Sequence, residues 1–394
     1  MGKKATMVLS FVLIICMTGV AAFALTPKEE LGKAIFFDEN LSINANQSCA
    51  TCHSPETGWT GTKSDVNAHG AVYEGSIPNA FGNRKPPSSA YATQSPILHV
   101  DKKGLFVGGN FWDGRATGEK LGNPAADQAQ GPFLNPVEQA LPTPADVVTR
   151  VCASSYGDLF REVWGTEACD PDKVNLAYDY IGLSIAAYEA SPEVNAFTSK
   201  FDWSMVGKAK LTLQERKGFS LFQGKGKCQR CHVSNGRAPL FTDFTYDNLG
   251  IPKNPENPFY THNPEFVDGG LGDFLASRLD YAQYAPANAG KHKVPTLRNV
   301  DLRPSKDFVK AYGHNGYFKS LWGIVHFYNT RDVLRVCPGP YTEAQALAAN
   351  CWPPPEVPQN VNTAELGNLG LTREEEDAIV AFLRTLSDGF VPGR

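Results

Sequence analysis

The chain has 394 residues, a net charge of −4 and an isoelectric point near 6.1. This charge balance argues against a nucleic-acid partner, because nucleic-acid-binding surfaces are strongly basic. The length exceeds what a single hydrophobic core usually supports, so two domains are expected. The 36 glycines and 28 prolines predict long irregular connections between helices.

The chain begins with a predicted signal peptide. Lys3 and Lys4 precede an apolar stretch over residues 7–20, and small residues at Ala22 and Ala24 suit a signal peptidase. The stretch is shorter than the roughly 20 residues that a membrane-spanning helix needs, although an uncleaved anchor is the alternative reading. We expect cleavage after Ala24 and export to a bacterial periplasm, with no membrane attachment afterwards.

A repeated pattern, T-x-x-E-x-x-G-x-x-x-F, starts at Thr26 and again at Thr212. The T-x-x-E part is a capping box, which predicts a helix start in each half. Apolar periodicity predicts closing helices over residues 175–189 and 372–386; in the first, the residues expected on one face are Leu176, Ile181, Ile185 and Tyr188.

Each repeat leads into a C-x-x-C-H motif, Cys49-Ala-Thr-Cys52-His53 and Cys228-Gln-Arg-Cys231-His232. Two thiols at this spacing can add to the two vinyl groups of one haem, and the adjacent histidine then binds its iron. A zinc site would need a second ligand pair close in sequence, and a redox pair would suit a βαβ setting. We therefore predict two covalent c-type haems.

The repeat and the motifs together predict a mainly α fold of two cytochrome c-type haem domains with long irregular loops. Residues 1–24 form the signal peptide, residues 25–205 the first domain and residues 206–394 the second. Four further cysteines in an exported chain suggest disulfides, and sequence proximity favours Cys152–Cys169 and Cys337–Cys351. Other pairings stay open.

Methionine is nearly absent after the leader, where Met205 is the only one. Methionine is the usual sixth iron ligand of electron-carrying cytochromes c. Two methionine-ligated carrier domains in tandem are therefore excluded.

Four segments resemble the bacterial di-haem cytochrome c peroxidases, and most of all the MauG-like branch: "GGNFWDGRATG" (108–118), "QGPFLNPVEQAL" (130–141), "KVPTLRNV" (293–300) and "YGHNGYFKSLWGIVHFYNTRD" (312–332). The resemblance covers essentially the whole chain after the leader. It implies a peroxide-reacting haem in the first domain and an electron-transfer haem in the second.

The resemblance also implies roles for individual residues. Trp112 matches a tryptophan between the two haems, and Glu138 matches the acid/base beside the peroxide site. Gln128 and Pro132 match residues that line the same pocket. Ordinary alternatives exist: Trp112 could simply pack in the core, and Asn135-Pro-Val-Glu138 is itself a capping box that predicts a helix start. His69 has the spacing of a removable sixth iron ligand, or is a loop histidine.

The expected sixth ligand of the second haem is Tyr328. In the family this ligand lies 14 residues after the histidine of an H-[D/N]-G element, here His314. The nearest rival ligand is His326, which a helix would point away on another face. A core tyrosine is the structural alternative for Tyr328.

Two departures from the family pattern stand out. A tryptophan that MauG carries two residues before its second haem motif is replaced by Gly226. The resemblance also implies a calcium ion between the domains, bound by an asparagine after the first motif and by carbonyl groups near the T-L-R-N segment. Here Asn83 is the candidate asparagine, slightly out of register.

Three function classes follow. The first is a MauG-like enzyme that uses hydrogen peroxide and stored high-valent iron to oxidise side chains of a partner protein. The second is a cytochrome c peroxidase that takes electrons from a small cytochrome or cupredoxin. The third is a non-catalytic di-haem electron carrier.

Overall fold

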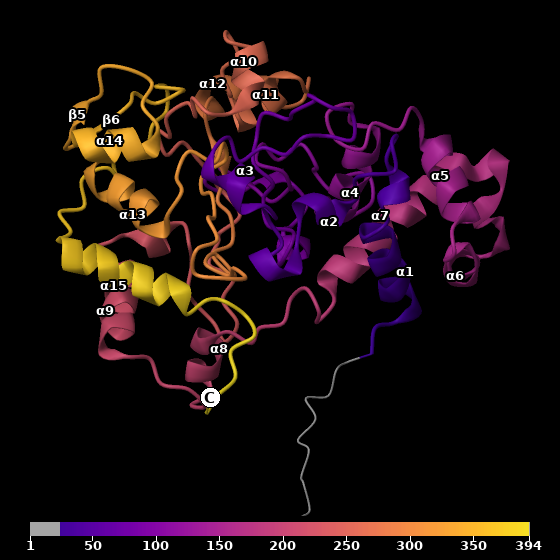
Figure 1. The fold of residues 1–394 in the computed structure, drawn as a ribbon, viewed down its shortest axis with the longest axis horizontal. Helices are drawn as coiled ribbons and strands as arrows, with labels where there is room; N and C mark the ends of the chain where they lie inside the picture. The colour runs from indigo at the N-terminus through magenta and orange to yellow at the C-terminus, as the bar shows by residue number, and fades with distance from the viewer. Residues whose placement is uncertain (1–23, 394) are drawn as a thin grey trace, which may run out of the picture.

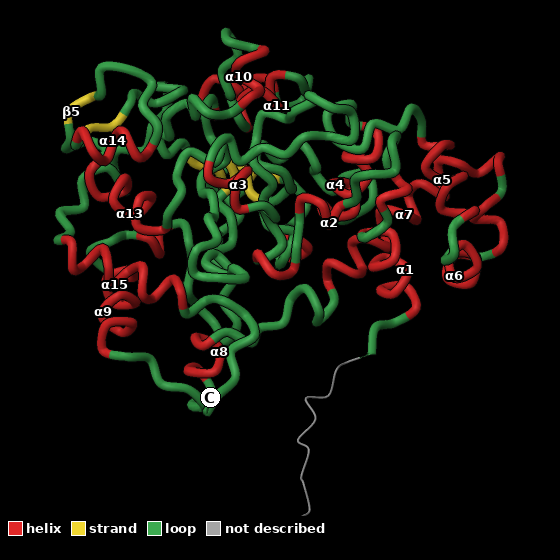
Figure 2. The backbone as a smooth tube through the Cα atoms, in the orientation of Figure 1, coloured by secondary structure: helices red, strands yellow, loops and turns green. Residues whose placement is uncertain are grey.

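The computed structural model describes residues 24–393 (Figure 1). All of the predicted signal peptide except Ala24 lies outside this range. The described chain is mainly α-helical, and none of its helices is long and apolar enough to cross a membrane. Much of the chain between the helices is irregular loop, as Figure 2 shows.

The helices have the following bounds: α1 Pro27–Phe36, α2 Cys49–Cys52, α3 Ser64–Ala68, α4 Pro124–Leu134, α5 Pro144–Ala153, α6 Gly157–Trp164, α7 Val174–Ala190, α8 Lys200–Met205, α9 Leu213–Gln223, α10 Pro258–His262, α11 Leu271–Ala276, α12 Ala285–Asn288, α13 Leu321–Thr330, α14 Glu343–Ala349 and α15 Arg373–Arg384. Short strand pairs join β1 His99–Val100 to β2 Phe106–Val107, β3 Tyr246–Asp247 to β4 His292–Lys293, and β5 Arg335–Val336 to β6 Cys351–Trp352. The first two pairs are antiparallel and the third is parallel.

The sequence repeat builds the same helix crossing twice. The capping boxes at Thr26 and Thr212 start α1 and α9, as predicted. A Cβ atom added to Gly32 would lie 1.9 Å from the Ser184 carbonyl oxygen of α7, and one added to Gly218 would lie 1.8 Å from the Ala378 carbonyl oxygen of α15. Each repeat therefore carries a glycine because two helix backbones approach closely at that point.

Two large hydrophobic cores follow the order of the chain. One gathers buried residues between positions 31 and 194 around α1 and α7, and the other gathers residues between 201 and 386 around α9, α13 and α15. Figure 1 shows these helix groups at opposite ends of the molecule. The domain boundary at 205/206 stays a prediction.

Both disulfides form as proximity suggested. Cys152 is bonded to Cys169 and Cys337 to Cys351. Each bridge closes a short loop within one half of the chain. The four cysteines of the two C-x-x-C-H motifs are free.

Two local expectations are wrong. Leu176 is 42% exposed, whereas Ile181, Ile185 and Tyr188 are buried. At about 100° per residue, position 176 lies about 140° away from position 181 on α7, so the four cannot share one face. The segment 135–138 does not start a helix: Asn135 ends α4, and a turn follows.

Candidate functional site

The first C-x-x-C-H motif forms the short helix α2 followed by His53. The Nδ1 atom of His53 lies 3.0 Å from the Trp59 carbonyl oxygen. Since a carbonyl only accepts, Nδ1 carries the proton and Nε2 keeps its lone pair. Burial lowers the pKa of His53 to about 4, so the imidazole is neutral at pH 7. This is the form that binds iron.

The second motif repeats this arrangement. Residues Cys228–Arg230 form a 3-10 turn, and the Nδ1 atom of His232 lies 2.8 Å from the Phe241 carbonyl oxygen. Burial lowers the pKa of His232 and raises the pKa of the Cys228 thiol to about 12. Burial likewise raises the pKa of Cys52 to about 12. Both thiols are therefore protonated at pH 7.

Each motif histidine lines a cavity, and Trp112 lines both. A cavity of about 70 Å³ is bordered by His53, Gln128 and Trp112. A larger one of about 200 Å³ is bordered by His232, both motif cysteines of the second half and Trp112. The indole Nε1 of Trp112 donates to the Lys85 carbonyl oxygen at 2.8 Å, which fixes the ring.

These features fit two covalently attached haems. Free thiols, a histidine with one nitrogen left for iron, and an adjoining cavity occur together in each half. The buried ring of Trp112, 8% exposed, lies between the two cavities.

Glu138 lies in the turn after α4, close to the first motif. The Nδ2 atom of Asn135 donates to its Oε2 atom at 2.7 Å. Burial raises the pKa of Glu138, and its charge in turn helps to raise the pKa of Cys52. The capping-box residues Asn135 and Glu138 are therefore joined by a side-chain hydrogen bond, but they do not start a helix.

Gln128 and Pro132 stand one turn apart on α4. The side of α4 that carries Gln128 faces the smaller cavity with His53. Pro132 is half-buried and is not among the residues that line that cavity. The structure thus brings Gln128 to the cavity but does not place Pro132 on it.

Tyr328, in the last turn of α13, borders the larger cavity together with His232. Burial first, then the nearby Cys231 and Cys228 thiols, raise the pKa of Tyr328 far above its ordinary value. The rival His326 points to α15, where its Nδ1 atom lies 2.9 Å from Glu376 Oε1. Met205 ends α8 and is 50% exposed, so it is not a candidate ligand.

His69 and Asn83 are not brought to either cavity. His69 is exposed at the end of α3, and its Nδ1 atom donates to the Asp65 carbonyl oxygen at 2.8 Å. Asn83 is half-buried, and its backbone carbonyl accepts a hydrogen bond of 2.9 Å from Asn257 Nδ2.

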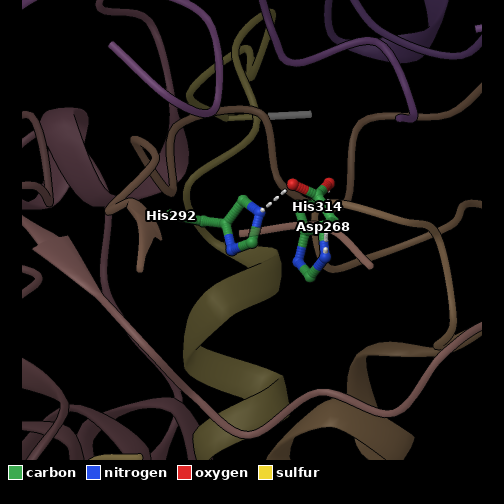
Figure 3. A group of neighbouring side chains, drawn as sticks. All are labelled: Asp268, His292 and His314. Carbon is green, nitrogen blue, oxygen red and sulfur yellow. Dashed lines mark ion pairs between the residues drawn. The ribbon is translucent and has the colours of Figure 1, made fainter. Parts of the chain in front are cut away.

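A buried polar group on the larger cavity was not anticipated from the sequence. Figure 3 shows Asp268 with His292 and His314, whose rings stack at 3.5 Å between centroids and 9° between planes. Arg84 donates to both Asp268 oxygens, at 2.6 and 2.7 Å. The Nε2 atom of His292 lies 3.3 Å and that of His314 4.0 Å from the Asp268 carboxylate, so three side chains of metal-ligand type lie close together here.

Buried lysines were also missed. Lys85, Lys293 and Lys310 all line the larger cavity, and burial lowers the pKa of both Lys85 and Lys293 to about 7. Lysine is rarely buried, so no composition or periodicity signal could have found them. Their position depends on loops that fold over one another.

The chain is similar to proteins of known family throughout its described length. Residues 26–210 match the model of the di-haem cytochrome c peroxidases. The "Methylamine utilization protein MauG" of Paracoccus denitrificans is 36% identical over 371 residues, 91% of this chain and 88% of that protein. The "Cytochrome c551 peroxidase" of Nitrosomonas europaea is 31% identical over 300 residues, 74% of this chain and 71% of that protein.

A solved structure of this family is also similar to the chain. The diheme peroxidase BthA from Burkholderia thailandensis is 30% identical, has a TM-score of 0.78, and the match covers 94% of this chain and 88% of that chain. The same family is supported by the repeated C-x-x-C-H motifs, by the cavities beside them and by these similarities. The chain belongs to the di-haem cytochrome c peroxidase family of oxidoreductases, which carry two c-type haems.

Proposed function

We propose that this protein is exported to the periplasm and uses hydrogen peroxide to oxidise side chains of a partner protein, as a MauG-like enzyme. Cys49, Cys52 and His53 would hold the peroxide-reacting haem in residues 25–205. The corresponding residues of the second motif would hold the electron-transfer haem in residues 206–394. The observation that carries the proposal is Tyr328, which borders the second cavity where a carrier would present methionine.

When bound, the haems would supply redox-active iron with an open position for peroxide. In the overall reaction hydrogen peroxide takes up two electrons and two protons and leaves as two water molecules. The two electrons come from side chains of the partner protein. The work left to this chain is to move protons at peroxide and electrons between the two haems.

Glu138 is the proposed proton carrier. Its carboxylate would take the proton from the near oxygen of peroxide and return it to the far oxygen as the bond between them breaks. The hydrogen bond from Asn135 holds the Oε2 atom, so Oε1 is the atom available for this transfer. Gln128, on the cavity beside His53, is a second polar group that could orient peroxide.

Trp112 is the proposed electron relay. Its indole borders both cavities, and its N–H is bonded to the Lys85 carbonyl oxygen. A ring held in one orientation between two haems shortens each electron-transfer step. Its burial also keeps water away from the oxidised indole.

Tyr328 is the proposed sixth ligand of the second iron. A phenolate is a hard anionic donor, which favours oxidised iron far more than a thioether does. Such a ligand would let the second haem share oxidising equivalents that arise at the first. Among the other candidates, His326 is bonded to Glu376 and the His292 and His314 rings stack beside Asp268.

The test replaces Tyr328 with phenylalanine and follows the ferric protein by optical and EPR spectroscopy. We expect the second haem to change from six- to five-coordinate. After stoichiometric peroxide is added, samples are titrated with a reductant at increasing times. Two oxidising equivalents should persist for much longer in the wild-type protein than in the variant. Tyr317→Phe is the matched control, because that buried phenol donates to the Tyr341 carbonyl oxygen and does not line the cavity.

An unchanged low-spin signal in Tyr328→Phe would show that the ligand lies elsewhere. A peroxidase fed by a small cytochrome or cupredoxin would then be favoured. Gly226 supports that second candidate, since the tryptophan expected there for long-range oxidation of a partner protein is missing. If neither haem iron reacts with peroxide, an electron carrier would instead be indicated.

A further inference from the structure

Lys310 sits in a cage of backbone carbonyl groups between the two halves of the chain. Its side chain is 3% exposed. Its Nζ atom donates to the carbonyl oxygens of Thr57 at 2.7 Å, Leu302 at 2.8 Å and Asn299 at 3.2 Å. Thr57 follows the first haem motif, whereas Asn299 and Leu302 belong to the T-L-R-N region of the second half.

The cage requires an ammonium ion. A carbonyl oxygen only accepts hydrogen bonds, so three carbonyl partners need three N–H donors. A neutral amine has two and would direct its lone pair at an oxygen atom. Burial lowers the pKa of Lys310, but this geometry favours the protonated form. A Cβ atom added to Gly58 would lie 2.7 Å from the Asn299 carbonyl oxygen and 3.3 Å from Lys310 Nζ, so a side chain at position 58 would disturb the cage.

Lys85 adds a second buried amino group nearby. Its side chain is 8% exposed, and its Nζ atom donates to Thr60 Oγ1 and to the Pro86 carbonyl oxygen, both at 2.9 Å. The charge of Lys85 acts on Lys310, and both residues line the cavity that contains His232 and Trp112. The Lys310 ammonium group and the Lys85 amino group therefore stand together at the junction of the two halves.

A calcium ion does not fit this junction. Calcium takes six to eight oxygen ligands, usually with carboxylates among them. The carbonyl oxygens of Asn299 and Leu302, in the T-L-R-N region, already accept hydrogen bonds from Lys310. A divalent ion would also be repelled by the Lys310 ammonium group.

We propose that the ammonium group of Lys310, with the amino group of Lys85 beside it, takes the place at this junction of the calcium ion that the family resemblance implies. Lys310 joins the two halves, because it donates to the Thr57 carbonyl oxygen of the first half and to the Asn299 and Leu302 carbonyl oxygens of the second. Both lysines line the larger cavity, so they would be available to pair with carboxylates of a haem bound there. Folding and haem coordination in this protein are then independent of calcium.

The first test measures metal content and calcium dependence in the holoprotein. Elemental analysis after gel filtration should find less than about 0.1 calcium per chain. Dialysis against EGTA should leave the melting temperature and the ferric EPR spectrum unchanged. One equivalent of bound calcium, or an EGTA effect that calcium reverses, overturns the proposal.

The second test probes the cage. Lys310→Ala should lower the melting temperature, and methylammonium, but not sodium chloride at equal ionic strength, should restore part of the loss. Lys253→Met is the matched control: Lys253 also donates to two carbonyl groups, of Pro264 and Phe266, but lies outside the cavity. It should change neither the haem spectra nor the response to methylammonium.

Wild-type stability in Lys310→Ala, or equal rescue by both salts, would contradict an ammonium cage. If Lys310→Ala does not fold, Lys85→Met takes its place, with a shift in the haem reduction potentials as the readout. An unshifted potential would remove Lys85 from the proposal. The metal analysis of the wild-type protein decides the calcium question in either case.

Discussion

Replacing Glu138 with glutamine isolates its role in proton transfer. Glutamine has the same shape, and its side-chain oxygen can still accept the 2.7 Å hydrogen bond that Asn135 now donates to Glu138. The variant therefore loses proton transfer while keeping the local geometry. A positioned acid/base contributes roughly 10²–10⁴-fold to a rate. We expect the reaction with peroxide to slow by that factor, which corresponds to about 3–5 kcal/mol in the activation free energy.

The assay is stopped-flow spectroscopy of the ferric protein with peroxide at several pH values, with mass spectrometry to show that both haems are bound. Burial raises the pKa of Glu138, so its carboxylate form is lost as the pH falls through a value above the ordinary carboxyl range. The rate of the wild-type protein with peroxide should therefore fall as the pH falls through this pKa. The rate of Glu138→Gln should not show this decrease. Glu74→Gln, at an exposed carboxylate, is the control. A Glu138→Gln rate equal to the wild type would refute the acid/base role.

Two further predictions concern the scaffold. Gly218→Ala should lower the free energy of unfolding by about 1–3 kcal/mol or more, because the new Cβ atom would meet the Ala378 carbonyl oxygen at 1.8 Å; Gly131→Ala, whose nearest contact would be 3.5 Å, should be near neutral in the same urea titration. Arg298→Met should cost about 3–5 kcal/mol, since it leaves Asp202 without the two 2.9 Å bonds from a guanidinium that is itself 1% exposed. A loss below about 1 kcal/mol by urea denaturation would show that Asp202 finds another partner or water.

The sequence was most informative where the chemistry is local. A C-x-x-C-H motif places two thiols and an imidazole within one turn, so its meaning does not depend on the rest of the fold. The capping boxes at Thr26 and Thr212 are also local, and both start helices. Periodicity was less reliable: it predicts Leu176 on the same face of α7 as Ile181, Ile185 and Tyr188, yet Leu176 is exposed and the other three are buried.

The same sequence pattern can also occur in a backbone that is not helical. Asn135 and Glu138 read as a capping box, yet the chain leaves α4 there and turns. The hydrogen bond between their side chains survives without the helix. Local pattern could predict that the two side chains meet, but not which backbone brings them together.

By itself the sequence determined two haem motifs, a mainly helical repeat and the lack of a methionine ligand, because each depends on residue types at fixed short spacings. Only the tertiary structure decided which distant residues share a cavity. Trp112 borders both cavities, Tyr328 rather than His326 faces the second, and Lys310 is held by carbonyl groups from both halves. These arrangements depend on loops that must satisfy buried polar groups across long sequence separations, and no short-range pattern records that requirement.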